Sequence, residues 1–223
     1  MLVFGTRPEA IKMAPLAREL SCREGFESLV CVTAQHREML DSVLEVFALR
    51  PDYDLDIMQP AQTLSGITTL VLEKLGAVLE QLQPDLVLVH GDTTTTFSAS
   101  LAAFYAKIPV GHVEAGLRTY DRWSPYPEEM NRSLVGRLAE LHFAPTALNA
   151  ENLRRENITQ GVYITGNTVI DALRFTVGGH TAFHDAFLRS FPFDRGRVLA
   201  MTCHRRENYG EPMEQILTAI RDT

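Results

Sequence analysis

Two short apolar runs, each followed by a carboxylate, constrain the fold of this chain more than any other feature of the sequence. The runs span residues 86–89 and 108–113, and a segment with helical character separates them. Continuous apolar runs are typical of strands buried on both faces, and a helix between two such strands makes them parallel. Parallel strands open at their carboxyl ends onto one crevice, where open α/β sheets bind ligands. Asp92 and Glu114 follow the two runs, so the sequence predicts an acid–base site at this edge of the sheet.

Strand and helix patterns alternate along most of the chain. This alternation predicts an α/β fold with a doubly wound, Rossmann-like parallel sheet. Residues 50–62 hold two prolines and are expected to form a loop, as are residues 117–127. We expect strands at residues 2–4, 28–33, 86–89, 110–113, 141–144 and 162–165, and helices at residues 8–20, 37–47, 64–82, 95–105, 128–138 and 147–156.

The chain is predicted to divide into three parts. The Rossmann-like domain takes residues 1–175, and a connector with a short helix takes residues 176–196. A strand at 197–202 and a helix at 211–221 are expected to form the first βα unit of a second Rossmann-like domain in residues 197–223. One strand and one helix cannot bury their apolar faces alone, so we expect this second domain to be truncated.

Composition narrows the range of partners and compartments. The formal net charge is −7, which disfavours nucleic acid and anionic membranes as main partners. No apolar run approaches the ~18 residues of a membrane span. Cys22, Cys31 and Cys203 form no C-x-x-C pair, so we expect the chain to work in the reducing cytoplasm.

Two turns carry residues suited to a phosphate. Residues 5–9 occupy the first strand-to-helix turn, where backbone N–H groups favour anions, and Arg7 and Lys12 add positive charge. His204 and Arg205 follow the strand expected at 197–202, and they suit a diphosphate. The first turn matches neither the G-x-G-x-x-G nor the P-loop spacing. The alternatives are an ordinary helix start and a solvated charged turn.

Two acidic residues, Asp92 and Glu114, are candidates for proton transfer, and a third, Glu128, has a structural explanation. Glu114 precedes Ala115-Gly116 instead of a helix, which makes a helix cap a poor explanation and favours a general base. Asp92 precedes four threonines, and its alternative role is the N-cap of the next helix. Glu128 opens a predicted helix, where the helix dipole stabilises an acidic residue by ~0.3–1 kcal/mol.

A metal site is a further alternative at the same two strand ends. His90, Asp92, His112 and Glu114 offer imidazole and carboxylate ligands, which suit zinc or iron. Each histidine precedes its carboxylate by two positions, and side chains in this arrangement need not converge. A histidine in a strand is more often a satisfied core residue.

Six ordered motifs spread over nearly the whole chain resemble the bacterial non-hydrolysing UDP-N-acetylglucosamine 2-epimerases. They are Phe4-Gly5-Thr6-Arg7-Pro8-Glu9-Ala10-Ile11-Lys12, Thr33-Ala34-Gln35-His36-Arg37, His90-Gly91-Asp92-Thr93-Thr94-Thr95, Gly111-His112-Val113-Glu114-Ala115-Gly116-Leu117-Arg118, Ser124-Pro125-Tyr126-Pro127-Glu128-Glu129-Met130-Asn131-Arg132 and Ile164-Thr165-Gly166-Asn167-Thr168. The resemblance implies a GT-B-type arrangement of two Rossmann-like domains around the active site. It implies interconversion of UDP-N-acetylglucosamine and UDP-N-acetylmannosamine through anti elimination of UDP, reprotonation of C2 and re-addition of UDP, with no cofactor and no metal.

The resemblance also implies roles for individual residues. The family's acid–base carboxylates correspond to Asp92, Glu114 and Glu128. Its histidine in the catalytic cleft corresponds to His204. The cationic residues of the family's N-terminal domain correspond to Arg7 and Lys12. A second, regulatory substrate-binding site of the family corresponds to Gln35, His36 and Gln62. UDP-N-acetylglucosamine is therefore expected as substrate and as allosteric activator of a homodimer in cell-surface polysaccharide biosynthesis.

Two departures from the family bear on these expectations. Cys203 stands where relatives commonly carry Gly or Ala, which affects the backbone before His204. The family's Asp-Ser-Gly-Gly segment, which holds uridine and ribose, does not occur in the chain, so we expect a fragment with little or no activity alone. The alternatives are a hydrolysing relative that releases UDP and N-acetylmannosamine, a non-catalytic nucleotide-sugar-binding module, and a metal hydrolase.

Overall fold

The chain forms two compact units in a computed structural model that describes residues 1–34, 37–59, 61–177, 183, 185–203 and 209–222. Unit 1 spans Met1–Gly179 and unit 2 spans His180–Thr223. The predicted limits of the connector and of a second Rossmann-like domain stay predictions.

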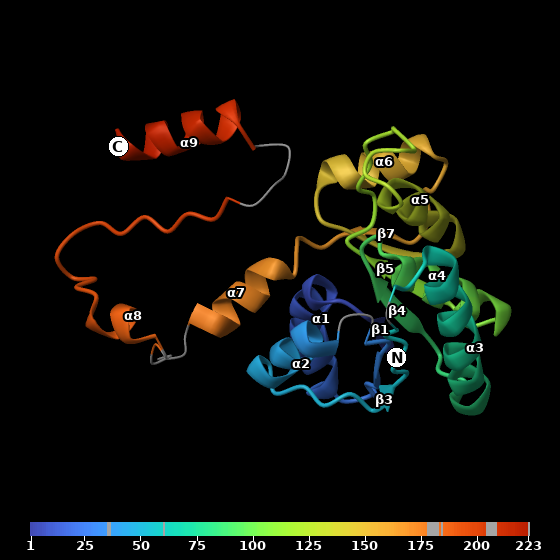
Figure 1. Ribbon diagram of the computed structural model, residues 1–223. Helices are drawn as coiled ribbons and strands as arrows, with labels where there is room; N and C mark the ends of the chain where they lie inside the picture. Colours follow the sequence, from blue (N-terminus) through green and yellow to red (C-terminus); the bar gives the residue numbers. More distant parts are fainter. Residues whose placement is uncertain (35–36, 60, 178–182, 184, 204–208, 223) are drawn as a thin grey trace. The chain divides into compact units, whose positions relative to one another are not determined.

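Unit 1 is a doubly wound α/β domain built on a seven-stranded sheet (Figure 1). The strands lie in the order β3-β2-β1-β4-β5-β6-β7, and all neighbouring strands are parallel. The predicted α/β fold with a Rossmann-like sheet is therefore confirmed. The strands are β1 Leu2–Phe4, β2 Val30–Val32, β3 Tyr53–Asp54, β4 Val87–His90, β5 Val110–Val113, β6 Leu141–Ala144 and β7 Val162–Ile164.

Helices cover both faces of this sheet (Figure 1). Helices α1, α2 and α7 contribute to the core on one face, and α3, α4 and α5 contribute to the core on the other. Helix α6 contacts β6 and β7. The helices of unit 1 are α1 Arg7–Ser21, α2 Arg37–Val46, α3 Leu64–Leu82, α4 Thr94–Tyr105, α5 Glu128–Leu138, α6 Ala147–Arg155 and α7 Val169–Val177.

Apolar periodicity explains how these elements pack. All four residues of β4 and of β5 are buried, as the continuous apolar runs predict for central strands. Helix α3 buries Ile67, Val71, Leu75 and Leu79, which recur at every fourth position and so form one stripe along the helix. Fully burying each such side chain contributes roughly 1.5–3 kcal/mol. Val87 pairs with Val110 and His90 with Val113, so β4 and β5 end at the same level.

Two elements of unit 1 differ from the sequence-based expectation. Strand β3 lies within the predicted loop, and its two residues are too few to show an alternating pattern. Helix α7 was not predicted. It leaves Ile170, Leu173 and Val177 more than half exposed.

The predicted strand at 197–202 is wrong. These residues carry no strand in the structure, and unit 2 offers them no neighbouring strand among its described residues. A strand without a partner leaves its backbone N–H and C=O groups unpaired, which explains why the apolar run alone does not form one. The described helices of unit 2 are α8 Ala186–Ser190 and α9 Glu211–Arg221. Helix α9 matches the predicted helix.

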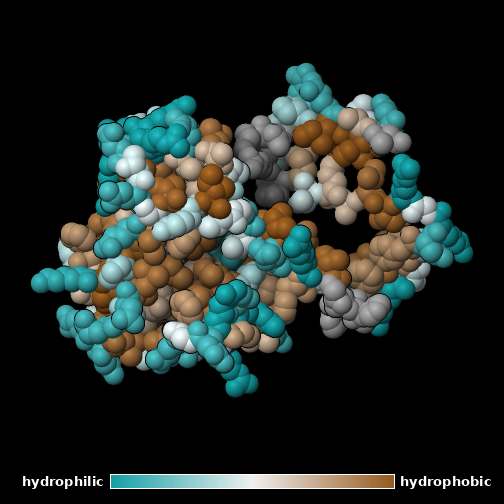
Figure 2. Space-filling view, turned by 180° about the vertical axis from the view of Figure 1, so that it is seen from behind, coloured by the Kyte–Doolittle hydropathy of each residue, from teal (hydrophilic) through white to brown (hydrophobic). Residues whose placement is uncertain are grey.

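The surface of the molecule mixes hydrophilic and apolar side chains. On the face in Figure 2, hydrophobic side chains gather in patches that hydrophilic side chains border. Across the residues that the structure describes, no helix combines the length and the hydropathy that crossing a bilayer requires.

A close backbone contact at Gly116 gives a first test of this fold. Gly116 has φ +86°, and a Cβ there would lie 2.2 Å from the carbonyl oxygen of Asn149 in α6. We therefore expect Gly116→Ala to lower the free energy of unfolding by roughly 2–4 kcal/mol, measured by urea denaturation. Gly25 is the matched control, because its φ is +85° but nothing lies within 4 Å of a Cβ there. Gly25→Ala should cost about 1 kcal/mol, and equal losses at the two positions would contradict the close-contact explanation.

Candidate active site

The carboxylate of Glu9 joins the turn after β1 to the turn after β4. Its Oε2 accepts hydrogen bonds from the backbone N–H groups of Gly5 (3.0 Å) and Thr6 (2.7 Å), and from the Thr6 hydroxyl (2.8 Å). Its Oε1 accepts from the Thr93 hydroxyl (2.6 Å) and lies 2.9 Å from the Thr96 hydroxyl, whose single proton also has the carbonyl oxygen of His90 within reach at 2.5 Å. Glu9 is only 2% exposed, so this network fixes the two turns against each other inside the protein.

Asp92 lies in the second of these turns and is available for chemistry. It does not cap α4, because Thr93 takes that place and its side chain accepts the N–H of Thr96 at 3.1 Å. Burial raises the pKa of Asp92 to about 6. The guanidinium of Arg132, 3.8 Å away, opposes this rise, while the nearby carboxylate of Glu128 adds to it. Asp92 can therefore both give and take a proton near neutral pH.

Glu114 follows β5, and its carboxylate faces a cation. It has φ +65°, an uncommon conformation for a residue other than glycine. Its Oε1 lies 2.5 Å from Lys12 Nζ and accepts from Asn167 Nδ2 at 2.9 Å. Its Oε2 lies 3.6 Å from His90 Nε2. Such backbone strain persists only where the surroundings over-determine it, and it clusters at functional sites.

Glu128 lines a pocket at the same edge of the sheet, where polar and charged side chains lie among apolar ones such as Met39 and Leu64. The pocket has a volume of about 420 Å³, and Arg7, Asn131 and Glu128 line it together with Thr93 and Thr94. Oε2 of Glu128 is buried and has no hydrogen-bond partner among the described residues. A buried carboxylate oxygen without a donor costs free energy, so this atom is suited to receive a donor from a ligand.

The neighbouring Glu129 has a structural role instead. Its carboxylate accepts the backbone N–H groups of Thr119 (3.0 Å) and Tyr120 (2.9 Å), and it lies 3.0 Å from Nε of Arg132. These contacts tie the loop at 117–127 to the start of α5, where Glu128 and Asn131 lie.

The strand histidines do not converge as metal ligands. His90, His112 and His142 are buried, and burial lowers the pKa of all three, in His112 to about 3. His112 turns its Nε2 to the carbonyl oxygen of Gly91 at 2.7 Å. In the described part of the chain, no group of three His, Cys, Asp or Glu side chains is placed to hold a metal ion. The geometry therefore does not support the metal-site alternative.

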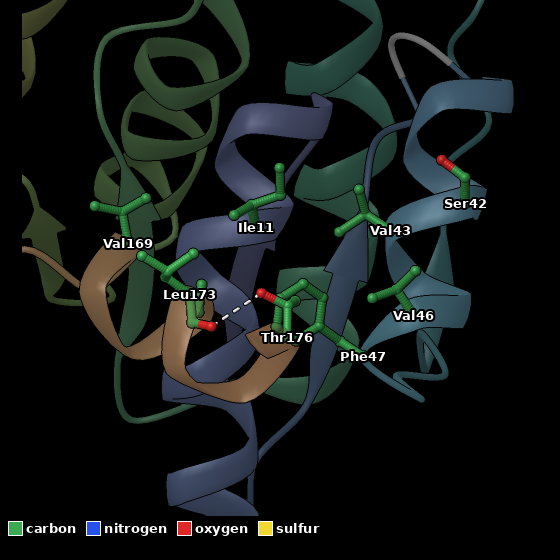
Figure 3. A pocket seen from close by; sticks show the side chains of 9 residues that line it. Ile11, Ser42, Val43, Val46, Phe47, Val169, Leu173 and Thr176 are labelled. Carbon is green, nitrogen blue, oxygen red and sulfur yellow. Dashed lines mark hydrogen bonds between the residues drawn. The ribbon is translucent and has the colours of Figure 1, made fainter. Parts of the chain in front are cut away.

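A second pocket lies away from the strand ends and is apolar. Its volume is about 360 Å³, and its lining comes from α1, α2, α7 and the residue after α2 (Figure 3). Ile11, Val43 and Leu173 are among the apolar side chains that point into it (Figure 3). None of the described residues that line this pocket is charged, so they do not supply the acid–base groups that the sequence predicts.

The structure brings five of the predicted site residues to one edge of the sheet. They are Arg7, Lys12, Asp92, Glu114 and Glu128. Gln62 donates its side-chain amide to the carbonyl of Ile57. Outside the described residues lie Gln35, His36, His204 and Arg205.

Sequence reasoning gave no role to several residues that build the site. Glu9 and Asn167 stand in the quoted motifs, but only the folded chain shows that they contact the turns and Glu114. The sequence signal that could have indicated their roles was their position in motifs that lie at the end of a strand or the start of a helix.

Comparison with known proteins gives one consistent family. A sequence profile for the UDP-N-acetylglucosamine 2-epimerase family matches residues 18–223. The UDP-N-acetylglucosamine 2-epimerase of Escherichia coli (strain K12) is 55% identical over 229 residues, which cover 100% of this chain and 61% of the relative. The chain thus spans about three fifths of the length of the curated relatives it matches.

Solved structures agree with this result. The UDP-GlcNAc 2-epimerase from Neisseria meningitidis bound to UDP-GlcNAc is 60% identical with a TM-score of 0.76, over 79% of this chain and 49% of that one. The S. aureus MnaA–UDP complex is 52% identical with a TM-score of 0.83, over 100% of this chain and 58% of that one.

The raised pKa of Asp92 predicts how stability depends on pH. The carboxyl binds its proton more tightly in the folded chain, with a pKa of about 6 against 3.8 ordinarily. Protonation therefore favours folding. This contribution is full below pH ~4 and is lost as the pH rises through ~6. Asp92→Asn should consequently raise the free energy of unfolding by about 1–3 kcal/mol at pH 7.5 and change it little at pH 4.

Urea denaturation at the two pH values measures this difference. Glu19→Gln is the control, because it also replaces a carboxyl by an amide but at a side chain that is 59% exposed and pairs with the exposed Arg23. An Asp92→Asn variant that is less stable than the wild type at pH 7.5 would contradict the burial of an ionised carboxylate.

Proposed function

The chain belongs to the UDP-N-acetylglucosamine 2-epimerase family, and on this premise we propose that its gene product interconverts UDP-N-acetylglucosamine and UDP-N-acetylmannosamine. The observation that carries the proposal is the meeting of Asp92, Glu114 and Glu128 with Lys12 and Arg7 at one edge of the sheet. Epimerisation at C2 needs a base, an acid and a cationic place for a leaving diphosphate, and this edge supplies all three kinds of group.

The reaction proposed is an elimination followed by an addition. A carboxylate removes the proton from C2 while the C1–O bond breaks, and the electron pair of the C–H bond forms the C1–C2 double bond as UDP leaves. A second carboxyl group then protonates C2 on the opposite face, and UDP re-adds at C1. Oxidation states balance over the cycle, so the cycle needs no redox partner.

The environments of the carboxyl groups suit different parts of this cycle. Asp92, with a pKa near 6, exchanges a proton readily at neutral pH. Glu114 is held by the ammonium group of Lys12 and the amide of Asn167. Glu128 presents a buried oxygen that lacks a donor, which suits a sugar hydroxyl or amide.

The departing diphosphate is proposed to lie near the start of α1. Arg7 lines the pocket there, and the N-terminal end of a helix favours anions. Lys12 is already paired with Glu114, so Arg7 is the cation of this turn that we propose as a phosphate ligand. His204 and Arg205 are proposed as further diphosphate contacts on the basis of the sequence.

A second molecule of UDP-N-acetylglucosamine is proposed as an allosteric activator. Gln35, His36 and Gln62 are the residues proposed for that regulatory site, and a cytoplasmic homodimer is the proposed assembly. Relatives solved with UDP-GlcNAc support binding of this nucleotide sugar.

Exchange of the C2 proton tests the proposed function. The full gene product is incubated with UDP-N-acetylglucosamine in D2O, and products are followed by 1H NMR. We expect deuterium at C2 together with UDP-N-acetylmannosamine. Free N-acetylmannosamine and UDP would indicate the hydrolysing reaction instead, and binding without exchange would indicate a non-catalytic nucleotide-sugar-binding module.

Amide variants test the individual carboxyl groups in the same assay. Asp92→Asn, Glu114→Gln and Glu128→Gln should each slow exchange by about 100-fold or more, because acid–base groups contribute 10²–10⁴-fold. Glu19→Gln, on the exposed side of α1, is the matched control and should keep the wild-type rate. Full exchange rates in all three site variants would refute the assignment.

A further inference from the structure

The imidazole of His112 makes one hydrogen bond, and that bond reaches the turn that carries Asp92. His112 is 1% exposed, and its Nε2 lies 2.7 Å from the carbonyl oxygen of Gly91. Nδ1 is buried and has no hydrogen-bond partner among the described residues. A carbonyl oxygen only accepts, so Nε2 must carry the hydrogen. Burial lowers the pKa of His112 to about 3, which leaves a neutral ring in one tautomer.

The bond acts on a turn whose shape decides where Asp92 points. Gly91 has φ +71°, a conformation that turns the chain sharply after β4. The next carbonyl, that of Asp92 itself, accepts from Asn131 Nδ2 at 2.9 Å. Two consecutive peptide carbonyls are thus held by side chains from different elements, His112 from β5 and Asn131 from α5. Without the first donor, the Gly91 peptide can rotate and carry Asp92 with it.

We propose that His112 is a positioning residue for the proposed proton transfer, which fixes the Gly91 carbonyl through Nε2–H and thereby holds the carboxylate of Asp92 in its place near Arg132. The inference rests on the proposed function for its effect on turnover, but the geometry it describes is independent of that function. It also gives the buried histidine of the Gly-His-Val-Glu motif a role other than metal binding.

The electrostatic surroundings of Asp92 explain why direction matters. Arg132 and Glu128 face it from α5, Glu114 faces it from the end of β5, and Glu9 faces it from α1. Rotation of the turn changes all four interactions and exposes the carboxylate to water. Misplacement of a catalytic group by about 1 Å can cost 10²-fold in rate.

Two variants of His112 separate the hydrogen bond from the ring. His112→Phe keeps a ring and removes the donor, whereas His112→Gln places an amide donor near the position of Nε2. The matched control is His142→Phe. His142 is 2% exposed and lies beside His112 in the register of β5 and β6, but it belongs to the next strand. Its replacement removes a buried imidazole without touching the Gly91 carbonyl.

Steady-state kinetics on the full gene product with UDP-N-acetylglucosamine give the first readout. His112→Phe should lower kcat about 10- to 100-fold with little change in KM, and it should move the acidic limb of the pH profile from near pH 6 towards lower pH. His112→Gln should restore most of kcat, and His142→Phe should keep the wild-type profile. Equal kinetic effects of His112→Phe and His142→Phe would overturn the proposal.

NMR gives a second readout that does not depend on activity. Carboxyl 13C titration should show the pKa of Asp92 falling from about 6 in His112→Phe but not in His112→Gln, and 15N spectra should show the Nε2–H tautomer in the wild type. If His112→Phe does not fold, His112→Met, which adapts its shape to the core, replaces it. An unchanged titration of Asp92 refutes the positioning role, whereas a wild-type protein without epimerase activity refutes the proposed function alone.

Discussion

The buried carboxylate of Glu9 is the contact on which the arrangement of the site depends. An isolated ionised carboxylate is costly to bury, because the low-dielectric interior does not replace its hydration. Here five N–H and O–H groups from the turns after β1 and β4 surround the two oxygens. Each donor must be in place for the charge to be tolerated, so the two turns are coupled. Arg7 and Asp92, which adjoin these donors in sequence, lie in the two turns that Glu9 joins.

The same physics gives each carboxyl group of the site a different character. Glu9 is saturated with donors and is structural, and Glu129 is likewise satisfied by two backbone N–H groups. Asp92 is mostly buried, and its distance of 3.8 Å from Arg132 is too long for a strong ion pair, so burial prevails and its pKa rises. At neutral pH the buried, ionised carboxylate of Asp92 destabilises the folded chain. Destabilising residues of this kind are expected at positions where activity, and not stability, is selected. The satisfied carboxylates supply the rigidity that holds the unsatisfied ones.

Much of this could be predicted from the sequence, because the informative signals were local. The apolar runs before Asp92 and Glu114 predicted two parallel strands that end at one edge, and the structure has β4 and β5 in that register. Contacts between distant residues carried no such signal. Glu9 three residues after Thr6 has the spacing of an ordinary capping box, and nothing local shows that the hydroxyls of Thr93 and Thr96 also lie against it. The role of Asp92 as an N-cap was a reasonable alternative that failed because the adjacent Thr93 took the position.

The charge balance of the site indicates that most of the positive charge for a diphosphate must come from other parts of the protein. The chain carries a net charge of −7, and the proposed site gathers several carboxylates, yet it is proposed to release a diphosphate. Lys12 is paired with Glu114 and Arg132 with Glu129, so these cations are already engaged and contribute little to binding the anion. Among the described residues of this edge, Arg7 and the N-terminal end of α1 are left for the phosphates. In the proposed reaction this edge therefore contributes little of the affinity for UDP, and the residues proposed after position 203 are expected to supply the rest.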